Sequence, residues 1–121
     1  MKKILIVDGD STEAALFRKN LEERGYQIVD VVPDGKGAII AVITRAPDLI
    51  IVDVHLAGLP NGIETVERIR RFSPVPVLFT TAHLNPRLAE RAGCLPRSLF
   101  MYKPVDPGRL ADNVRLLLRI H

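Results

Sequence analysis

The sequence predicts one α/β domain of the (βα)5 type, in which a doubly wound parallel sheet carries helices on both faces. The length of 121 residues suits a single domain. Short apolar runs recur along the chain at nearly regular intervals, and segments with helical spacing lie between them. This alternation indicates parallel strands joined by right-handed crossovers, for which 2-1-3-4-5 is a common strand order.

The predicted strands are runs of four or five residues that are rich in Val, Ile and Leu. Gly, Pro or Asp bounds most of these runs, and this pattern is typical of strands buried on both faces of a sheet. In chain order, the predicted strands cover residues 4–7, 28–32, 49–52, 75–79 and 99–102.

A helix is predicted after each strand, because apolar residues recur there with helical spacing. In chain order, the helices lie around residues 15–23, 38–43, 63–70, 85–92 and 105–118. Asp10, followed three residues later by Glu13, has the pattern of an N-cap with an acidic third position. Asp106 precedes Pro107, and proline is favoured in the first turn of a helix. We expect Gly93 to end the fourth helix.

The composition excludes several classes of protein. Hydrophobic residues make up 47% and charged residues 26%, which rules out intrinsic disorder. The single cysteine, Cys94, excludes a disulfide framework and a multi-cysteine zinc site, and we expect it to pack as a small apolar residue. Apolar runs are far shorter than the ~20 residues of a membrane span, so we expect a cytoplasmic protein without membrane contact. The net charge of +3 is small, and the sequence shows no basic patch rich in aromatic residues. We therefore expect no nucleic-acid partner.

Chemically active side chains follow four of the five predicted strands. They are Asp8 and Asp10 after the first strand, Asp53 after the third, Thr80 and Thr81 after the fourth, and Lys103 after the fifth. In open α/β sheets, binding sites lie beyond the carboxyl ends of the strands, where the strand order reverses. We therefore expect these carboxylates, hydroxyls and the ammonium group to share one rim of the sheet.

This set of side chains suits phosphoryl transfer. Asp53 ends an apolar run and is the candidate nucleophile, which would form an acyl phosphate. Carboxylates crowded together repel one another unless a cation lies among them, and Mg²⁺ prefers such hard oxygen ligands. Lys103 would neutralise one phosphoryl oxygen, and Thr81 would donate a hydrogen bond to another.

In order and spacing, five motifs resemble those of a response-regulator receiver domain, the CheY-like module of two-component signalling. The motifs are residues 3–8, 47–53, 61–64, 74–82 and 103–104, and the resemblance covers essentially the whole chain. It implies a flavodoxin/CheY-like fold with Asp53 as phosphoacceptor, Thr81 as switch hydroxyl and Lys103 as phosphate-binding lysine. It also implies that Phe100 is the switch aromatic. The expected ligands of Mg²⁺ are Asp8, Asp53 and the backbone carbonyl of His55.

The main departure from this family is Gly9, because receivers usually carry two adjacent acids after the first strand. Either Asp10 replaces the missing metal ligand, or the Mg²⁺ site is weakened. The loop of residues 55–62 is longer than in most receivers. Residues 92–98 also differ from the segment that precedes the fifth strand in most receivers. This segment belongs to the output face of the family, so the resemblance does not indicate the binding partner.

We expect residues 1–121 to form a single receiver domain without an output domain. A histidine kinase or phosphotransfer protein would phosphorylate Asp53, and slow hydrolysis would reset it, without turnover of a separate substrate. The signal would pass to an unknown downstream protein through the fourth helix, fifth strand and fifth helix. The sequence is also compatible with a homodimer.

Two alternative functions are weighed. The first is a phosphorylation-independent adaptor, which Gly9 favours. The second is a fragment of a longer regulator or hybrid kinase, because residues 119–121 carry no helix stop signal. A flavodoxin-like cofactor binder is disfavoured because no glycine-rich phosphate loop follows the first strand.

Overall fold

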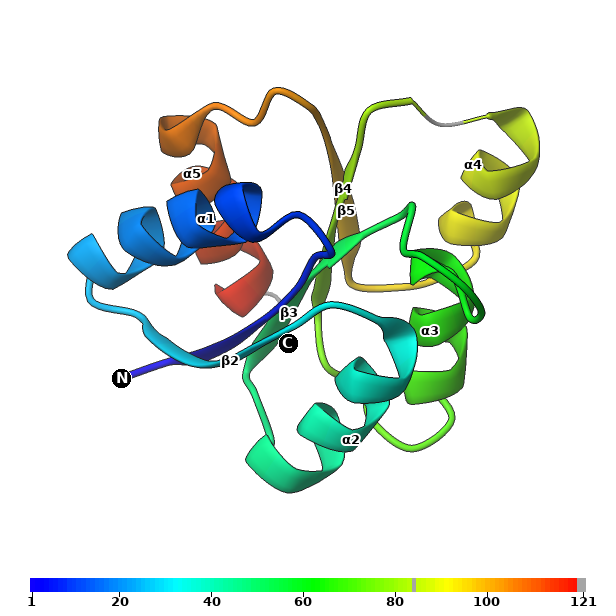
Figure 1. Cartoon of the computed structure of the whole chain (residues 1–121), viewed down its shortest axis with the longest axis horizontal. Coiled ribbons are helices and arrows are strands. Elements are labelled where there is room, and N and C mark those ends of the chain that lie inside the picture. The colour runs from blue at the N-terminus through cyan, green and yellow to red at the C-terminus, as the bar shows by residue number, and fades with distance from the viewer. Residues whose placement is uncertain (84, 120–121) are drawn as a thin grey trace.

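A computed structural model of the chain describes residues 1–83 and 85–119. The strands form one parallel sheet in the order β2-β1-β3-β4-β5. Helices α1 and α5 cover one face of the sheet, and α2, α3 and α4 lie on the other side (Figure 1). The predicted fold class and strand order are therefore confirmed.

The strands agree with the predicted runs to within two residues. They are β1 (Lys3–Val7), β2 (Gln27–Val32), β3 (Leu49–Asp53), β4 (Val77–Thr81) and β5 (Ser98–Tyr102). The fourth strand was predicted to begin at Val75 but begins at Val77, and the proline at position 76 has no N–H for a strand ladder. Burial on both faces holds for β3 and β4, whereas the edge strands β2 and β5 are only partly buried.

The helices also occur where the spacing predicts them. They are α1 (Ser11–Glu23), α2 (Gly35–Arg45), α3 (Gly62–Ile69), α4 (Pro86–Gly93) and α5 (Pro107–Arg119). Asp10 caps α1 as expected, and the Asp106 carboxylate accepts from the N–H of Arg109 at the start of α5. The packing predicted for Cys94 is wrong, because this residue is the exposed C-cap of α4.

The core consists of two apolar layers, one on each face of the sheet. Alternate strand residues point to opposite faces, so Leu5 and Val7 contribute to the layer beneath α2 and α3. Ile4 and Ile6 contribute to the layer beneath α1 and α5. This alternation continues to the carboxyl ends of the strands and decides which polar side chains share a face there.

One close approach fixes the backbone around Asp53. A Cβ atom at Gly62 would come within 2.1 Å of the Asp53 carbonyl oxygen, so only glycine allows α3 to begin at this point. The N–H of Gly62 donates to the carbonyl of Val54 over 3.0 Å. The glycine thus holds the start of α3 against the end of β3.

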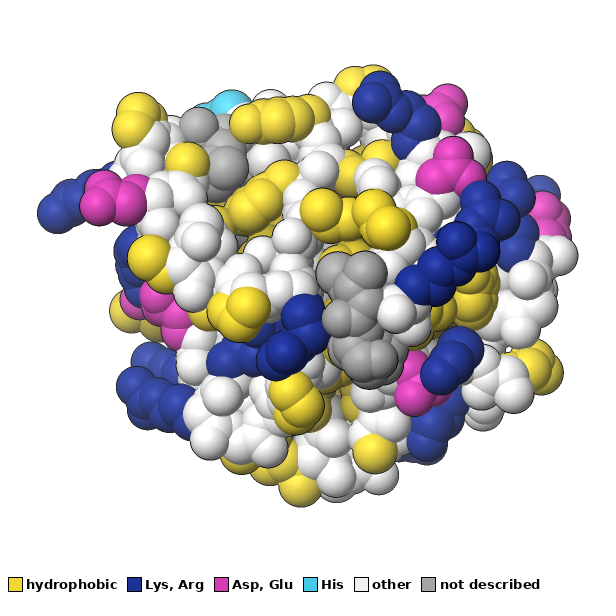
Figure 2. All heavy atoms as spheres, turned by 180° about the vertical axis from the view of Figure 1, so that it is seen from behind, with side chains coloured by type: hydrophobic (Ala, Val, Ile, Leu, Met, Phe, Trp, Pro, Cys, Tyr) yellow, Lys and Arg dark blue, Asp and Glu magenta, His cyan; other side chains and the backbone are white. Residues whose placement is uncertain are grey.

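The surface carries its charge in a dispersed form. Figure 2 shows Lys and Arg side chains spread over the rear face, interspersed with apolar and acidic side chains. Among the described residues, no helix combines the length and the apolar character needed to cross a membrane. Ile120 and His121, which bear on whether the last helix continues, lie outside the described residues.

Candidate functional site

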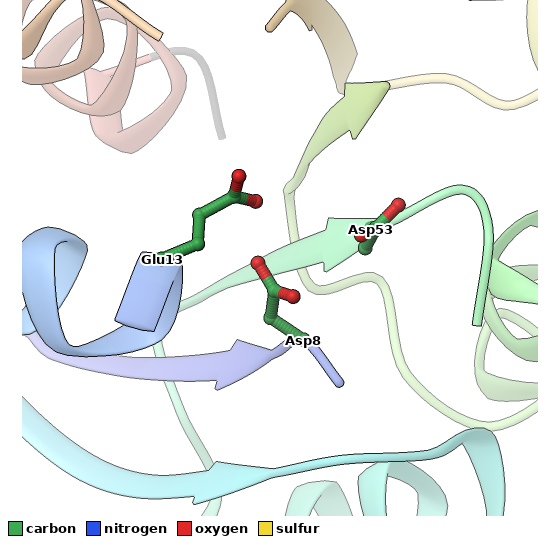
Figure 3. Close-up of side chains that lie close together, drawn as sticks. All are labelled: Asp8, Glu13 and Asp53. Atoms are coloured by element: carbon green, nitrogen blue, oxygen red, sulfur yellow. The ribbon is translucent and has the colours of Figure 1, made fainter. Parts of the chain in front are cut away.

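Three carboxylates converge at the carboxyl edge of the sheet. Asp8 follows β1, Asp53 ends β3, and Glu13 extends from the first turn of α1 (Figure 3). One oxygen atom from each lies within 4.8 Å of the others. The sheet and the following helix thus bring together residues that are far apart in the sequence, in a geometry suited to a cation.

The predicted substitute for the missing acid, Asp10, does not join this cluster. Its Oδ1 atom accepts hydrogen bonds from the N–H groups of Thr12 and Glu13, at 3.0 and 3.1 Å, and so caps α1. The third carboxylate comes instead from Glu13. In this structure Glu13, and not Asp10, therefore lies beside Asp8 and Asp53.

Glu13 is the site residue that sequence reasoning missed. Its position three residues after the N-cap indicates only a capping pattern in the sequence. In a complete capping box, the Glu13 side chain would accept from the backbone N–H of Asp10. That N–H donates to Oδ1 of Asp8 instead, over 2.8 Å. The sequence feature that could have identified Glu13 is its position. The first turn of a helix that follows a strand lies at the carboxyl rim of the sheet, where the other acids are expected.

Asp53 is buried and held by two donors. Its side chain is 9% exposed. The backbone N–H of His55 donates to Oδ1 over 2.9 Å, and Nζ of Lys103 donates to Oδ2 over 2.7 Å. These contacts fix the orientation of the carboxylate at the end of β3. Asp53 and Lys103, which the sequence analysis expects at one rim of the sheet, thus form a direct ion pair in the structure.

Lys103 also reaches the second acid of the cluster. Its Nζ atom lies 2.9 Å from Oε1 of Glu13, in a setting where its side chain is 21% exposed. Burial lowers the pKa of Lys103, but hydrogen bonds and charge interactions with Asp53 and Glu13 outweigh it and raise the pKa above its ordinary value. The ammonium group therefore stays charged and partly neutralises the acidic cluster.

Asp8 contributes a buried carboxyl group to the cluster. It is 4% exposed, and its Oδ2 atom has no hydrogen-bond partner among the described residues. Burial raises its pKa to about 7, the neighbouring Glu13 and Asp53 add to the rise, and the hydrogen bond from the Asp10 backbone opposes it. A carboxyl group with a buried, unpartnered oxygen beside two other acids fits a cation ligand.

The fourth strand brings two hydroxyl groups to this end of the sheet. Thr81 is fully buried, and its hydroxyl donates to the carbonyl oxygen of His83. His55 contacts the same carbonyl through Nε2 at 3.0 Å, and the His55 and His83 rings stack with centroids 5.0 Å apart. Thr80 is also fully buried, but its hydroxyl has no partner among the described residues.

Phe100, the predicted switch aromatic, lies in β5 and is only partly buried. Its ring stacks on Phe79 of β4 with centroids 4.8 Å apart and an interplanar angle of 17°. Phe79 immediately precedes Thr80 and Thr81, so the aromatic pair adjoins the strand end that carries both hydroxyl groups. The contact links the core at β4 to the surface at β5.

The fold and the site together define an α/β domain. At the carboxyl edge of its sheet, Asp53 forms an ion pair with Lys103 and lies beside two further acids. The family model for the response regulator receiver domain matches residues 4–115, so the chain belongs to this family of two-component signalling domains. Phosphoryl transfer is the general function of such domains. The expected family is thereby confirmed.

Proteins that resemble the chain include two transcriptional regulators. It is 34% identical over 120 residues to the alkaline phosphatase synthesis transcriptional regulatory protein PhoP of Bacillus subtilis, covering 98% of this chain and 49% of that protein. It is 37% identical over 117 residues to the transcriptional activator protein IrlR of Burkholderia pseudomallei, covering 97% and 50%. The chain thus spans about half the length of these curated relatives.

A solved structure shows the same fold across nearly the whole chain. The signal receiver domain of a modulated diguanylate cyclase from Desulfovibrio desulfuricans G20 has a TM-score of 0.89 and 28% identity. The match covers 98% of this chain and 94% of that one. Similar receivers therefore occur in proteins of different descriptions.

Proposed function

We propose that the chain accepts a phosphoryl group on Asp53 and passes the signal to another protein by a change of surface. The observation that carries this proposal is the setting of the Asp53 carboxylate. It is oriented by Lys103 and by the N–H of His55, beside two further acids. A buried carboxylate whose neighbours can balance added negative charge is suited to nucleophilic attack on phosphorus.

Mg²⁺ is the proposed cofactor, and the donor set fits it. Asp8, Glu13 and Asp53 supply hard oxygen atoms that lie close together, and Oδ2 of Asp8 lacks any other partner among the described residues. The backbone carbonyl of His55 is proposed as a further ligand by family resemblance. Bound Mg²⁺ would neutralise charge on the cluster and on the incoming phosphoryl oxygens.

The proposed donor is the phosphohistidine of a histidine kinase or phosphotransfer protein. A carboxylate oxygen of Asp53 attacks phosphorus, the P–O bond forms, and the P–N bond breaks as the imidazole leaves and takes up a proton. Lys103 balances the charge that accumulates on the phosphoryl oxygens. Attack of water on the same phosphorus later releases inorganic phosphate and restores the Asp53 carboxylate.

The output is proposed to begin at Thr81. In the present state its hydroxyl is bonded to the His83 carbonyl. A phosphoryl group on Asp53 would offer this hydroxyl a charged acceptor, and hydrogen bonds to charged acceptors are stronger. Movement of Thr81 would alter the neighbouring Phe79–Phe100 stack. The face formed by α4, β5 and α5 would then present a changed surface to a downstream protein in the cytoplasm.

The second candidate function is a phosphorylation-independent adaptor, which Gly9 favours because it removes a usual metal-ligand acid. The position of Glu13 supports the phosphoacceptor over the adaptor, since it supplies a third carboxylate. An adaptor would not need this acid to face Asp8 and Asp53. Phosphorylation and metal binding separate the two candidates directly.

The test is the intact mass of the chain after incubation with acetyl phosphate, with and without Mg²⁺. We expect a Mg²⁺-dependent gain of one phosphoryl group in the wild type and none in Asp53→Ala. Asp112→Ala is the matched control, because this aspartate is exposed on α5, far from the cluster in sequence, and forms an ion pair with Arg115. No gain in the folded wild type at any Mg²⁺ concentration would refute the phosphoacceptor and favour the adaptor.

A further inference from the structure

Thr80 is a buried polar residue that the proposed mechanism does not use. It is 0% exposed, and its Oγ1 atom has no hydrogen-bond partner within the described parts of the chain. A buried hydroxyl without a partner makes the fold less stable than one that is hydrogen-bonded. Such a group in a native fold calls for a specific explanation.

The strand register places Thr80 directly beside the phosphoacceptor. Thr80 pairs with Asp53 of β3 on one side and with Met101 of β5 on the other. Leu78 and Met101 both belong to the apolar layer beneath α1 and α5, whereas Phe79 belongs to the opposite layer. Because side chains alternate along a strand, Thr80 faces the same side as Leu78.

Asp53 shares that side of the sheet. Ile51 belongs to the layer beneath α1 and α5, so Asp53, two residues further along β3, points the same way. Lys103 follows β5, and β4 lies between β5 and β3 in the sheet. To reach Oδ2 of Asp53, the side chain of Lys103 therefore has to cross β4 close to Thr80.

The ion pairs of Lys103 indicate when a hydroxyl at this place would be needed. In the present state, its ammonium group is shared between Asp53 and Glu13. Both carboxylates belong to the proposed metal cluster, and Asp53 is also the group to be phosphorylated. When these oxygens take up a cation or a phosphoryl group, the ammonium loses acceptors that now hold it over β4.

We propose that Thr80 is a positioning residue whose hydroxyl becomes a hydrogen-bond partner of the Lys103 ammonium in the loaded site. This inference rests on the proposed function of Asp53 as phosphoacceptor. The hydroxyl is left unsatisfied in the resting state and satisfied when Lys103 turns to the phosphoryl group. The stability lost in the resting state is recovered on loading, which favours the loaded state.

The first test is the thermal stability of the full chain without metal. Thr80→Val removes the hydroxyl at nearly constant shape, and we expect its Tm to rise by about 3–6 °C. Thr65→Val is the matched control, because Thr65 is equally buried but its hydroxyl donates to the Asn61 carbonyl over 2.7 Å. We expect this control to lower the Tm. An unchanged or lower Tm in Thr80→Val would overturn the proposal.

The second test measures the loaded site in two ways. With Mg²⁺ and acetyl phosphate, we expect Thr80→Val to gain the phosphoryl group about tenfold more slowly than wild type, and Thr80→Ser to stay within about twofold. With Mg²⁺ and beryllofluoride, a phosphoryl mimic, we expect a smaller rise of Tm in Thr80→Val than in wild type or Thr80→Ser. The serine variant restores the hydroxyl and so separates its role from packing.

The outcomes distinguish this inference from the function beneath it. If wild type neither gains a phosphoryl group nor responds to beryllofluoride, the proposed function fails and the role of Thr80 fails with it. If wild type does both and Thr80→Val matches it, only the role of Thr80 is overturned. A loss in Thr80→Val that Thr80→Ser fails to rescue also overturns that role, because packing alone would then explain it.

Discussion

The backbone N–H of Asp10 donates a hydrogen bond to Oδ1 of Asp8 over 2.8 Å, which ties the start of α1 to the end of β1. In a complete capping box, the Glu13 carboxylate would accept a hydrogen bond from this N–H. Because Asp8 accepts that hydrogen bond, the Glu13 carboxylate faces Asp8 and Asp53 instead (Figure 3). The site thereby has a third acid although glycine stands at position 9.

Glu13 is expected to contribute to Mg²⁺ affinity, whereas Asp10 is not. Glu13→Gln removes one charged oxygen ligand from the cluster, so we expect the Kd for Mg²⁺ to rise about tenfold or more. Asp10→Asn is the control, because asparagine caps helices about as well as aspartate. Isothermal titration with Mg²⁺ measures both variants. Equal weakening in the two would contradict the assignment of Glu13.

Gly9→Asp is expected to tighten Mg²⁺ binding, with the Kd falling by about tenfold, because it adds a carboxylate to the rim. A Cβ atom at this position would lie 3.6 Å from the Pro33 carbonyl oxygen, which is an ordinary contact, so the fold should tolerate the change. Gly9→Asn has nearly the same shape without the charge and serves as the control. An unchanged Kd in Gly9→Asp would mean that the added carboxylate does not reach the cation.

Asp8 is expected to make the metal-free protein less stable as the pH rises. Its pKa is about 7 in the folded chain against an ordinary value of 3.8, so the folded state binds the proton more tightly than the unfolded state. The stability from this group is therefore complete at low pH and is lost as the pH rises through about 7.

Asp8→Asn should remove this dependence. We expect it to be more stable than wild type at neutral pH without metal by about 4 kcal/mol at most, and to lose that advantage towards pH ~4. Urea unfolding at several pH values measures the difference. Adding Mg²⁺ should stabilise wild type more than Asp8→Asn, because the ion binds the charged carboxylate. A variant that gains nothing at neutral pH would argue against a raised pKa for Asp8.

Gly62→Ala tests how the backbone of Asp53 is held. The added methyl group would meet the Asp53 carbonyl oxygen at 2.1 Å, so we expect a loss of about 2–3 kcal/mol in stability. We also expect slower phosphorylation, because relief of the clash displaces Asp53. Gly93→Ala is the control, since no described residue beyond its own helix and chain neighbours lies within 4 Å of the added atom. Similar stabilities for the two variants would show that the end of β3 can yield.

Much of the fold could be predicted because its signals are local. A buried parallel strand corresponds to a short apolar run, so the sequence predicts where β3 ends, next to Asp53. The start of α1 is predicted in the same way, because Asp10 caps the first turn of the helix that follows it. Asp53 and Lys103 could be placed at one rim because parallel strands end at the same edge. The structure brings them to 2.7 Å.

The family and the rim at which the acids gather can be read from the sequence, and the alternation of strands and helices favours the observed strand order. Which of these acids face one another depends on tertiary contacts. Asp10 and Glu13 both fit a capping pattern, and the choice between them depends on Asp8 accepting the Asp10 N–H. The isolation of the Thr80 hydroxyl and the bond of Thr81 to His83 are equally nonlocal. Such contacts depend on the packing of several segments at once, which no local pattern records.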